Sequence, residues 1–178
     1  GSQWNNSGYL HVGHEGSGTL TVKKGGVVSN TTGNIGHGSS VTTGTGMATV
    51  TGLGSQWTNS TSLYVGGNSS GGGGNGTLNL NNSGLVTVSD ITKLWSTGTI
   101  NLDGGTLDTG TLDLALGTFN MLDGYLHADH VIGDLDVQGG VVAPGNSPGV
   151  MSILGNYIQR PNATLEIELG ETFDQPPG

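Results

Sequence analysis

The 178-residue chain has no cysteine and few charged residues. Charged side chains make up 10 % of it, and only four are Lys or Arg, whereas about a quarter of an ordinary globular domain is charged. The absence of cysteine excludes disulfides, thiol catalysis and thiolate metal sites. The scarcity of basic residues removes the positive surface that nucleic acids and anionic membranes attract, and no apolar run approaches the roughly 20 residues of a membrane span. We therefore predict neither nucleic-acid binding nor membrane insertion by this segment.

Glycine is abundant instead, with 36 residues, about three times its average share. The glycines keep no three-residue period, which excludes a collagen-like triple helix. No stretch shows sustained helical spacing of apolar residues, so we predict no helices. The charge is unevenly distributed, because residues 1–89 carry a net charge of +1 and residues 90–178 a net charge of −10.

An internal repeat with a period of 53 residues organises the first half of the chain. Gly1-Ser-Gln-Trp4 recurs as Gly54-Ser-Gln-Trp57, and an eroded third copy begins at Trp95. The second copy contains a glycine-rich insertion at residues 68–75, which we expect to be a surface loop. We predict a single domain with repeats at 1–53 and 54–94, eroded coils at 95–138, further coils at 139–170 and a tail at 171–178.

Apolar residues recur as short i, i+2 pairs, which is the strand pattern with one buried face. Strands of two or three residues are unstable alone or in a hairpin, but they become stable when stacked on equivalent strands. The sequence therefore predicts an all-β, parallel β-solenoid (β-helix) with coils of about 25 residues, two per repeat and roughly seven in all. A β-sandwich or jelly roll is the alternative, although its strands are longer and need no such repeat. The residues expected to point inward are Leu10, Leu20, Val22, Leu63, Val65, Leu78 and Leu80.

Two regions of the chain resemble exported bacterial proteins. The segment from Gly1 to Val22, with its Gly-Ser-Gln-Trp and Gly-Thr-Leu-Thr-Val motifs, looks like the repeat shared by autotransporter passengers and PEP-CTERM exported proteins. Residues Gly139–Gly149, which contain Ala-Pro-Gly-Asn-Ser-Pro-Gly, resemble a signature found late in autotransporter passengers. The resemblance implies a right-handed, single-stranded β-helix exported to the surface of a Gram-negative bacterium or beyond. It carries over no catalytic residue, because the shared motif is structural.

The tryptophans Trp4, Trp57 and Trp95 recur at one place in the repeat. We expect each to fill a coil interior or corner and to stack on its counterpart. Leu10 and Leu63, and likewise Leu20 and Leu78, are expected to be equivalent core positions of the two copies. An exposed tryptophan strip that stacks on sugars is the alternative interpretation.

Seven aspartates between positions 103 and 136 raise the alternative of a carbohydrate-active β-helix, a polysaccharide lyase or hydrolase. Carboxylates about 5–9 Å apart perform general acid–base catalysis on glycosidic bonds, and adjacent coils could pair Asp103 with Asp123 or Asp113 with Asp136. A lyase acting on uronates also needs basic residues, and only Arg160 lies nearby. Solvated turn aspartates explain the series more simply, so we predict no enzymatic activity and no catalytic residue.

No cofactor is expected, and calcium is the only metal that the composition favours even weakly. Stacked turn carboxylates could supply its hard oxygen ligands, but the nonapeptide repeat of calcium-binding β-rolls is absent. A zinc site at His127-Ala-Asp-His130 is disfavoured, because these two histidines point to opposite faces of a strand.

The ends of a solenoid present unpaired strand edges, which invite strand addition. We expect residues 165–169 to form the last strand, after which Pro176 and Pro177 cannot continue the ladder. The tail could dock Phe173 on a neighbouring subunit, and the charge asymmetry favours head-to-tail contact. We therefore predict end-to-end homo-oligomers of a non-enzymatic extracellular structural protein. It would be a surface stalk, an adhesin segment that meets a glycan or host receptor, or the subunit of a filament.

Overall fold

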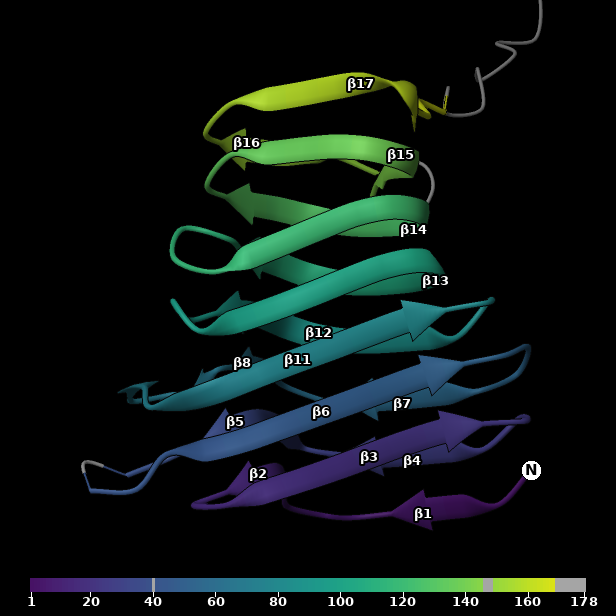
Figure 1. Ribbon diagram of the computed structural model, residues 1–178. Helices are drawn as coiled ribbons and strands as arrows, with labels where there is room; N and C mark the ends of the chain where they lie inside the picture. The colour runs from purple at the N-terminus through teal and green to yellow at the C-terminus, as the bar shows by residue number, and fades with distance from the viewer. Residues whose placement is uncertain (40, 146–148, 169–178) are drawn as a thin grey trace, which may run out of the picture.

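The computed structural model describes residues 1–39, 41–145 and 149–168. Within these ranges there is no helix, and seventeen strands are formed. Fifteen of them build one large sheet that curls around the apolar side chains, so that the strands rise in a stack from the N-terminus (Figure 1). Pairing in this sheet is parallel, which contradicts the antiparallel sandwich. The predicted all-β, solenoid-like fold is confirmed.

Strand pairing follows three lines along the stack, and each line is numbered here by its order in the chain. The first line contains β1 (Gln3–Asn5), β4 (Val27–Asn30), β7 (Gln56–Asn59), parts of β12 (Leu85–Leu94), β13 (Gly98–Asp113), β14 (Thr118–Ile132) and β15 (Leu135–Pro144), and the end of β17 (Tyr157–Leu165). The second line contains β2 (Tyr9–His14), β5 (Thr32–His37), β8 (Leu63–Val65), later parts of β12, β13 and β14, and β16 (Ser152–Leu154). The third line contains β3 (Ser17–Lys23), β6 (Gly44–Thr51), β11 (Gly74–Asn81), early parts of β13, β14 and β15, and the start of β17.

The strands in the second half of the chain are longer than predicted. β13 runs for 16 residues and serves all three lines, because it turns the corners with shifts of register instead of ending there. Such bulges bend a strand while its pairing continues. The last strand differs from the prediction of a strand at 165–169. β17 begins at Tyr157 and ends at Leu165, so of the described residues 165–168 only Leu165 lies in a strand.

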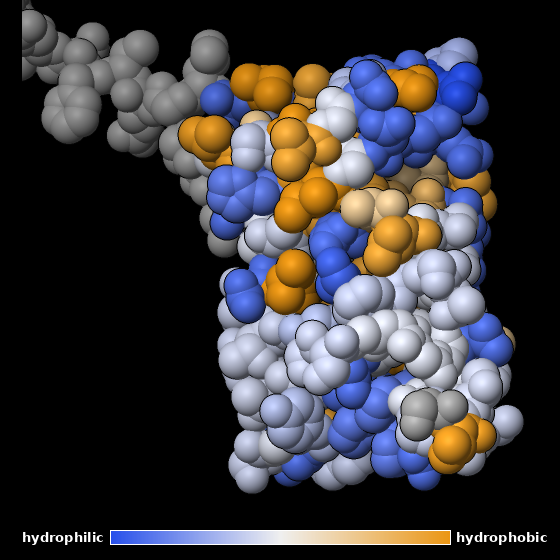
Figure 2. Space-filling view, turned by 90° about the vertical axis from the view of Figure 1, so that its left-hand side faces the viewer, coloured by the Kyte–Doolittle hydropathy of each residue, from blue (hydrophilic) through white to orange (hydrophobic). Residues whose placement is uncertain are grey.

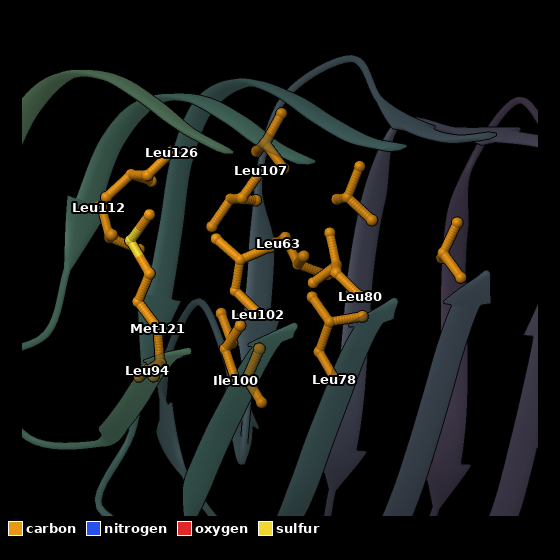
Figure 3. Packing of buried hydrophobic residues seen from close by; sticks show 14 of the residues in the cluster. Leu63, Leu78, Leu80, Leu94, Ile100, Leu102, Leu107, Leu112, Met121 and Leu126 are labelled. Carbon is orange, nitrogen blue, oxygen red and sulfur yellow. The ribbon is translucent and has the colours of Figure 1, made fainter. Parts of the chain in front are cut away.

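Apolar residues in register form continuous columns inside the stack. One column on the third line has at most 3 % exposure at every level and consists of Val22, Val50, Leu80, Leu102, Met121 and Val137. Figure 3 shows Leu102 between Leu80 and Met121. Strands about 4.8 Å apart bring each side chain against those above and below, and full burial of such a side chain is worth about 1.5–3 kcal/mol. These columns hold the three lines together.

Six of the seven residues predicted to point inward are buried. Leu20 is only partly buried and packs against the edge of the core, because it lies on β3, which pairs with only one other strand among the described residues, and its partner in β6 is the small Ala48.

The sequence repeat corresponds to two levels of the stack. Trp4 pairs with Val28 and Val28 with Trp57, so two successive steps on the first line span the period of 53 residues. The insertion of the second copy is not simply a loop. It contains a short antiparallel hairpin, β9 (Gly67–Asn68) with β10 (Gly71–Gly72), and the Asn68 side-chain oxygen accepts hydrogen bonds from the amides of Ser70 and Gly71 at 2.8 and 3.1 Å.

The alternation of inward and outward positions predicts a sharp contrast between two neighbours on β14. Met121 is fully buried in the column, whereas Leu122 is 51 % exposed. Met121→Ala should lower the free energy of unfolding by about 2–5 kcal/mol, because it removes buried volume. Leu122→Ala should cost less than about 1 kcal/mol. Urea denaturation of both variants checks the pair, and equal losses would contradict the register described here.

Candidate functional site

The three tryptophans occupy three different environments. Trp57 is fully buried, and its Nε1 donates a hydrogen bond to Oδ1 of Asn30 at 2.6 Å. Trp4 lies at the same register position two levels below, but it is 51 % exposed because β1 pairs with only one strand among the described residues. Trp95 follows β12 on the second line, is half-buried, and donates from Nε1 to the Asn68 carbonyl at 3.0 Å. The expectation that they stack on one another is therefore wrong, since Val28 separates Trp4 from Trp57 and Trp95 belongs to another line.

A buried amide network surrounds Trp57. Asn30 donates from Nδ2 to Oδ1 of Asn59 at 2.8 Å while it accepts from Trp57, and both asparagines are buried. A second amide ladder lies partly exposed on the third line, where Asn120 donates to Asn101 at 2.8 Å and Asn101 to Asn79 at 2.9 Å. Parallel register allows this, because an amide is both donor and acceptor and can repeat from level to level. Both networks join side chains of successive levels by hydrogen bonds.

The acidic series is only partly brought together. Asp103 and Asp123 are direct partners between β13 and β14, and both are exposed, so this possible pairing is found. Asp113 and Asp136 lie on different lines, the second and the third, so their possible pairing is not. The physical reason is that successive levels differ in length, so that one coil's spacing in sequence does not ensure alignment in space.

The two basic residues of the C-terminal half are held by other carboxylates. Lys93 forms an ion pair with Asp113 and places its Nζ 4.8 Å from the centre of the Trp95 ring. Arg160 donates to Asp136 from Nε at 2.9 Å and from Nη2 at 2.7 Å. These hydrogen bonds lower the pKa of Asp136. Arg160 therefore binds Asp136. A lyase acting on uronates would need such a basic residue beside the Asp103–Asp123 pair.

His127 and His130 lie on different lines of the stack, whereas the sequence predicted opposite faces of one strand. His127 pairs with Asp108 on the first line, and His130 lies on the second line with Nδ1 2.6 Å from Oγ of Ser152. In the part of the chain that the structure describes, no three or more His, Cys, Asp or Glu side chains are grouped so as to hold a metal ion. The predicted subunit-contact residues Phe173, Pro176 and Pro177 lie outside the described residues.

A group of three histidines, which the sequence analysis missed, lies on the second line. His11 and His14 belong to β2 and His37 to β5, and His14 and His37 are direct partners. The ring centroids of His14 and His37 are 4.8 Å apart, and His11 lies 5.1 and 5.6 Å from them. We call this group the histidine cluster.

Glycines at a corner of the stack create the histidine cluster. Gly13 and Gly36 have φ angles of +75° and +68°, which L side chains adopt at a cost, and a Cβ on Gly13 would lie 2.0 Å from the Thr45 carbonyl oxygen. The resulting break in strand alternation lets His11 and His14, three positions apart, share one face. The available sequence signal was an apolar residue followed by Gly-His, at 12–14 and again at 35–37.

The surroundings of His11 and His37 favour their neutral rings. Burial, followed by the charges of His14 and His37, lowers the pKa of His11. Burial and His14 likewise lower the pKa of His37, against an opposing effect of Glu15. Both pKa values therefore lie below the ordinary value of about 6.5.

These features define the class as a parallel, solenoid-like β-protein. No protein-family model matches the chain, and no curated protein or solved structure matches it either. No helix among the described residues has the length and apolar character needed to cross a membrane.

The buried amide network predicts a position-specific cost. Asn30→Ala leaves Nε1 of Trp57 and Oδ1 of Asn59 buried without partners, and each such group costs about 1–3 kcal/mol. We expect a combined loss of about 2–5 kcal/mol of unfolding free energy. Asn120→Ala, at the end of the partly exposed ladder, is the matched control and should cost about 1 kcal/mol or less. Chemical denaturation measures both, and a loss no larger for Asn30→Ala than for Asn120→Ala would contradict this account.

Proposed function

We propose that this chain is a right-handed parallel β-helix of about seven coils that serves as a non-enzymatic structural rod outside a Gram-negative bacterium. The proposal is carried by one observation, the in-register parallel pairing that continues on three lines from β1 to β17. Backbone hydrogen bonds then run along the stack, and a stack of seven levels would be roughly 34 Å tall.

The side-chain distribution supports a rod that spaces or displays. Inward positions carry aliphatic columns, and outward positions on the first line include Ser29, Thr58 and Thr87, which pair from level to level. An outer surface of small polar residues is easily hydrated and needs no further layer to cover it. Stalks, adhesin segments and filament subunits all require this property.

The proposed extracellular location rests on the resemblance of residues 1–22 and 139–149 to autotransporter passengers and PEP-CTERM proteins. The absence of cysteine suits an exported protein, since stray disulfides cannot form. A surface glycan or a host receptor is the kind of partner that an adhesin segment would meet.

End-to-end association with a second copy is the partner arrangement that we propose. Among the described residues, β1, β2 and β3 each pair on one side only, and so do β16 and β17. Such edges can continue a parallel ladder. Ile158, Leu165 and Ile167 at the β17 end are 40 %, 41 % and 63 % exposed, and apolar residues gather toward that end of the face in Figure 2. A head-to-tail contact of this kind does not close, so it would propagate as a filament.

A carbohydrate-active β-helix is the second candidate function, and one observation favours it. The Asp103–Asp123 partnership is the kind of carboxylate pair that glycoside hydrolysis uses.

End-to-end association predicts a concentration-dependent rod length. Leu165→Lys places a charge on the exposed apolar end and should reduce association at least tenfold, because a charge must be desolvated at the contact. Val41→Lys, at a corner residue that is 88 % exposed, is the control and should associate like the unmodified chain. Sedimentation velocity and electron microscopy measure this. Monomers at all concentrations, or equal association of the two variants, would refute the arrangement.

The acidic pair separates the two candidate functions. Like charges directly opposite each other in a sheet are destabilising, so Asp103→Asn should slightly raise the melting temperature at low salt, with the gain disappearing in 1 M NaCl. We expect no polysaccharide cleavage by the unmodified chain. Cleavage that is lost in Asp103→Asn or Asp123→Asn would establish the enzymatic alternative instead.

A further inference from the structure

The histidine cluster lies across a strand pair, so its charge acts directly on the pairing of β2 with β5. His14 and His37 are direct partners in that pair, and their rings are stacked with an interplanar angle of 29°. Tyr9 extends the stack, with its ring centroid 5.9 Å from that of His11. Among the described residues, β2 pairs with no strand other than β5. The charge state of these rings therefore acts on the one strand pairing that β2 makes among the described residues.

The hydrogen bond between Asn68 and His37 shows which protonation state this geometry requires. The Asn68 side-chain oxygen is already used by the backbone amides of Ser70 and Gly71, which fixes the orientation of the amide group. Its Nδ2 therefore faces Nε2 of His37, at 2.7 Å. An amide Nδ2 only donates, so His37 accepts with an unprotonated Nε2 and carries its proton on Nδ1. Protonation of Nε2 would set two donors against each other and break this bond.

A second proton on His37 would also meet an unfavourable environment. Nδ1 of His37 is buried and has no hydrogen-bond partner among the described residues, so the positive charge of a doubly protonated ring would find no partner at this atom. The titratable groups around it are His11 and His14 of β2, Glu15 at the following corner and Tyr9 at the start of β2, while β9 contributes the uncharged Asn68. The carboxylate of Glu15 opposes the effect.

We propose that the histidine cluster is an acid-sensitive latch, which holds β2 on β5 while its rings are neutral and releases this strand pair when they are protonated. Release would free the edge of β5, which could then pair with another strand. The proposal concerns one strand pair and does not depend on the structural role proposed above.

The lowered pKa values of His11 and His37 give the direction of the effect. Because the folded state holds these protons less tightly than the unfolded state, stability decreases as the pH falls below about 6.5 and continues to decrease until the folded pKa values are passed. Acid therefore opens the latch, and neutral pH closes it.

Hydrogen exchange of the full chain, followed by mass spectrometry at pH 7.5 and pH 5.0 and corrected for intrinsic rates, tests the latch. We expect protection of β2 amides to fall at least tenfold at pH 5.0, while β13 amides keep theirs. His14→Gln should reduce the change at least threefold, because it removes one of the repelling charges. His130→Gln, which alters an exposed histidine of the same line near its other end, should leave it unchanged. Equal protection of β2 at the two pH values, or equal effects of His14→Gln and His130→Gln, would overturn the proposal.

A variant with the opposite sign keeps the test independent of simple destabilisation. Asn68→Asp retains an oxygen for the hairpin amides and presents a carboxylate oxygen to Nε2, which stabilises the protonated ring. It should move the opening of β2 to lower pH. Nitrogen NMR of the unmodified chain should show an unprotonated Nε2 on His37 at pH 7.5. A protonated Nε2 there, or no shift in Asn68→Asp, would contradict the latch.

Discussion

Parallel pairing at one strand spacing places residues of successive levels directly above one another, and most features of this protein depend on that constraint. A side chain in such a stack is enclosed mainly by its counterparts above and below. One residue from each level is therefore enough to form the buried column that runs from Val22 on β3 to Val137 on β15. The same constraint leaves Trp4 and Leu165 exposed at positions equivalent to buried Trp57, because each has a neighbour on one side only.

Stacking also brings like residues together, and its energetic effect depends on their chemistry. Asparagines gain from it, because each amide both donates and accepts, as between Asn79, Asn101 and Asn120. Aspartates lose, because two carboxylates in register, as at Asp103 and Asp123, repel each other. In the proposed latch, neutral histidine rings stack, whereas protonated rings repel one another. The amide ladders, the acidic pair and the histidine cluster are thus three consequences of one geometry.

The corners between strands set which residues of successive levels pair with one another. Gly13 and Gly36 have positive φ angles and allow a turn where a side chain would meet backbone atoms. They also shift which of the following residues point inward and which point outward. Bulges in β13 and β14 turn the chain without ending its pairing. Since corner segments vary in length, equivalent residues are not separated by a constant number of positions along the chain.

The i, i+2 apolar pairs and the 53-residue repeat by themselves determined an all-β parallel stack with Leu63, Leu78 and Leu80 inside. The reason is that apolar units of two or three residues are unstable as isolated strands and are stabilised by stacking on equivalent units. Only the tertiary structure decided which residues meet. It separated Asp113 from Asp136, gave the three tryptophans three environments, and joined His11, His14 and His37. Register between levels depends on corner geometry and on the number of paired neighbours, and neither is encoded in the local period of the sequence.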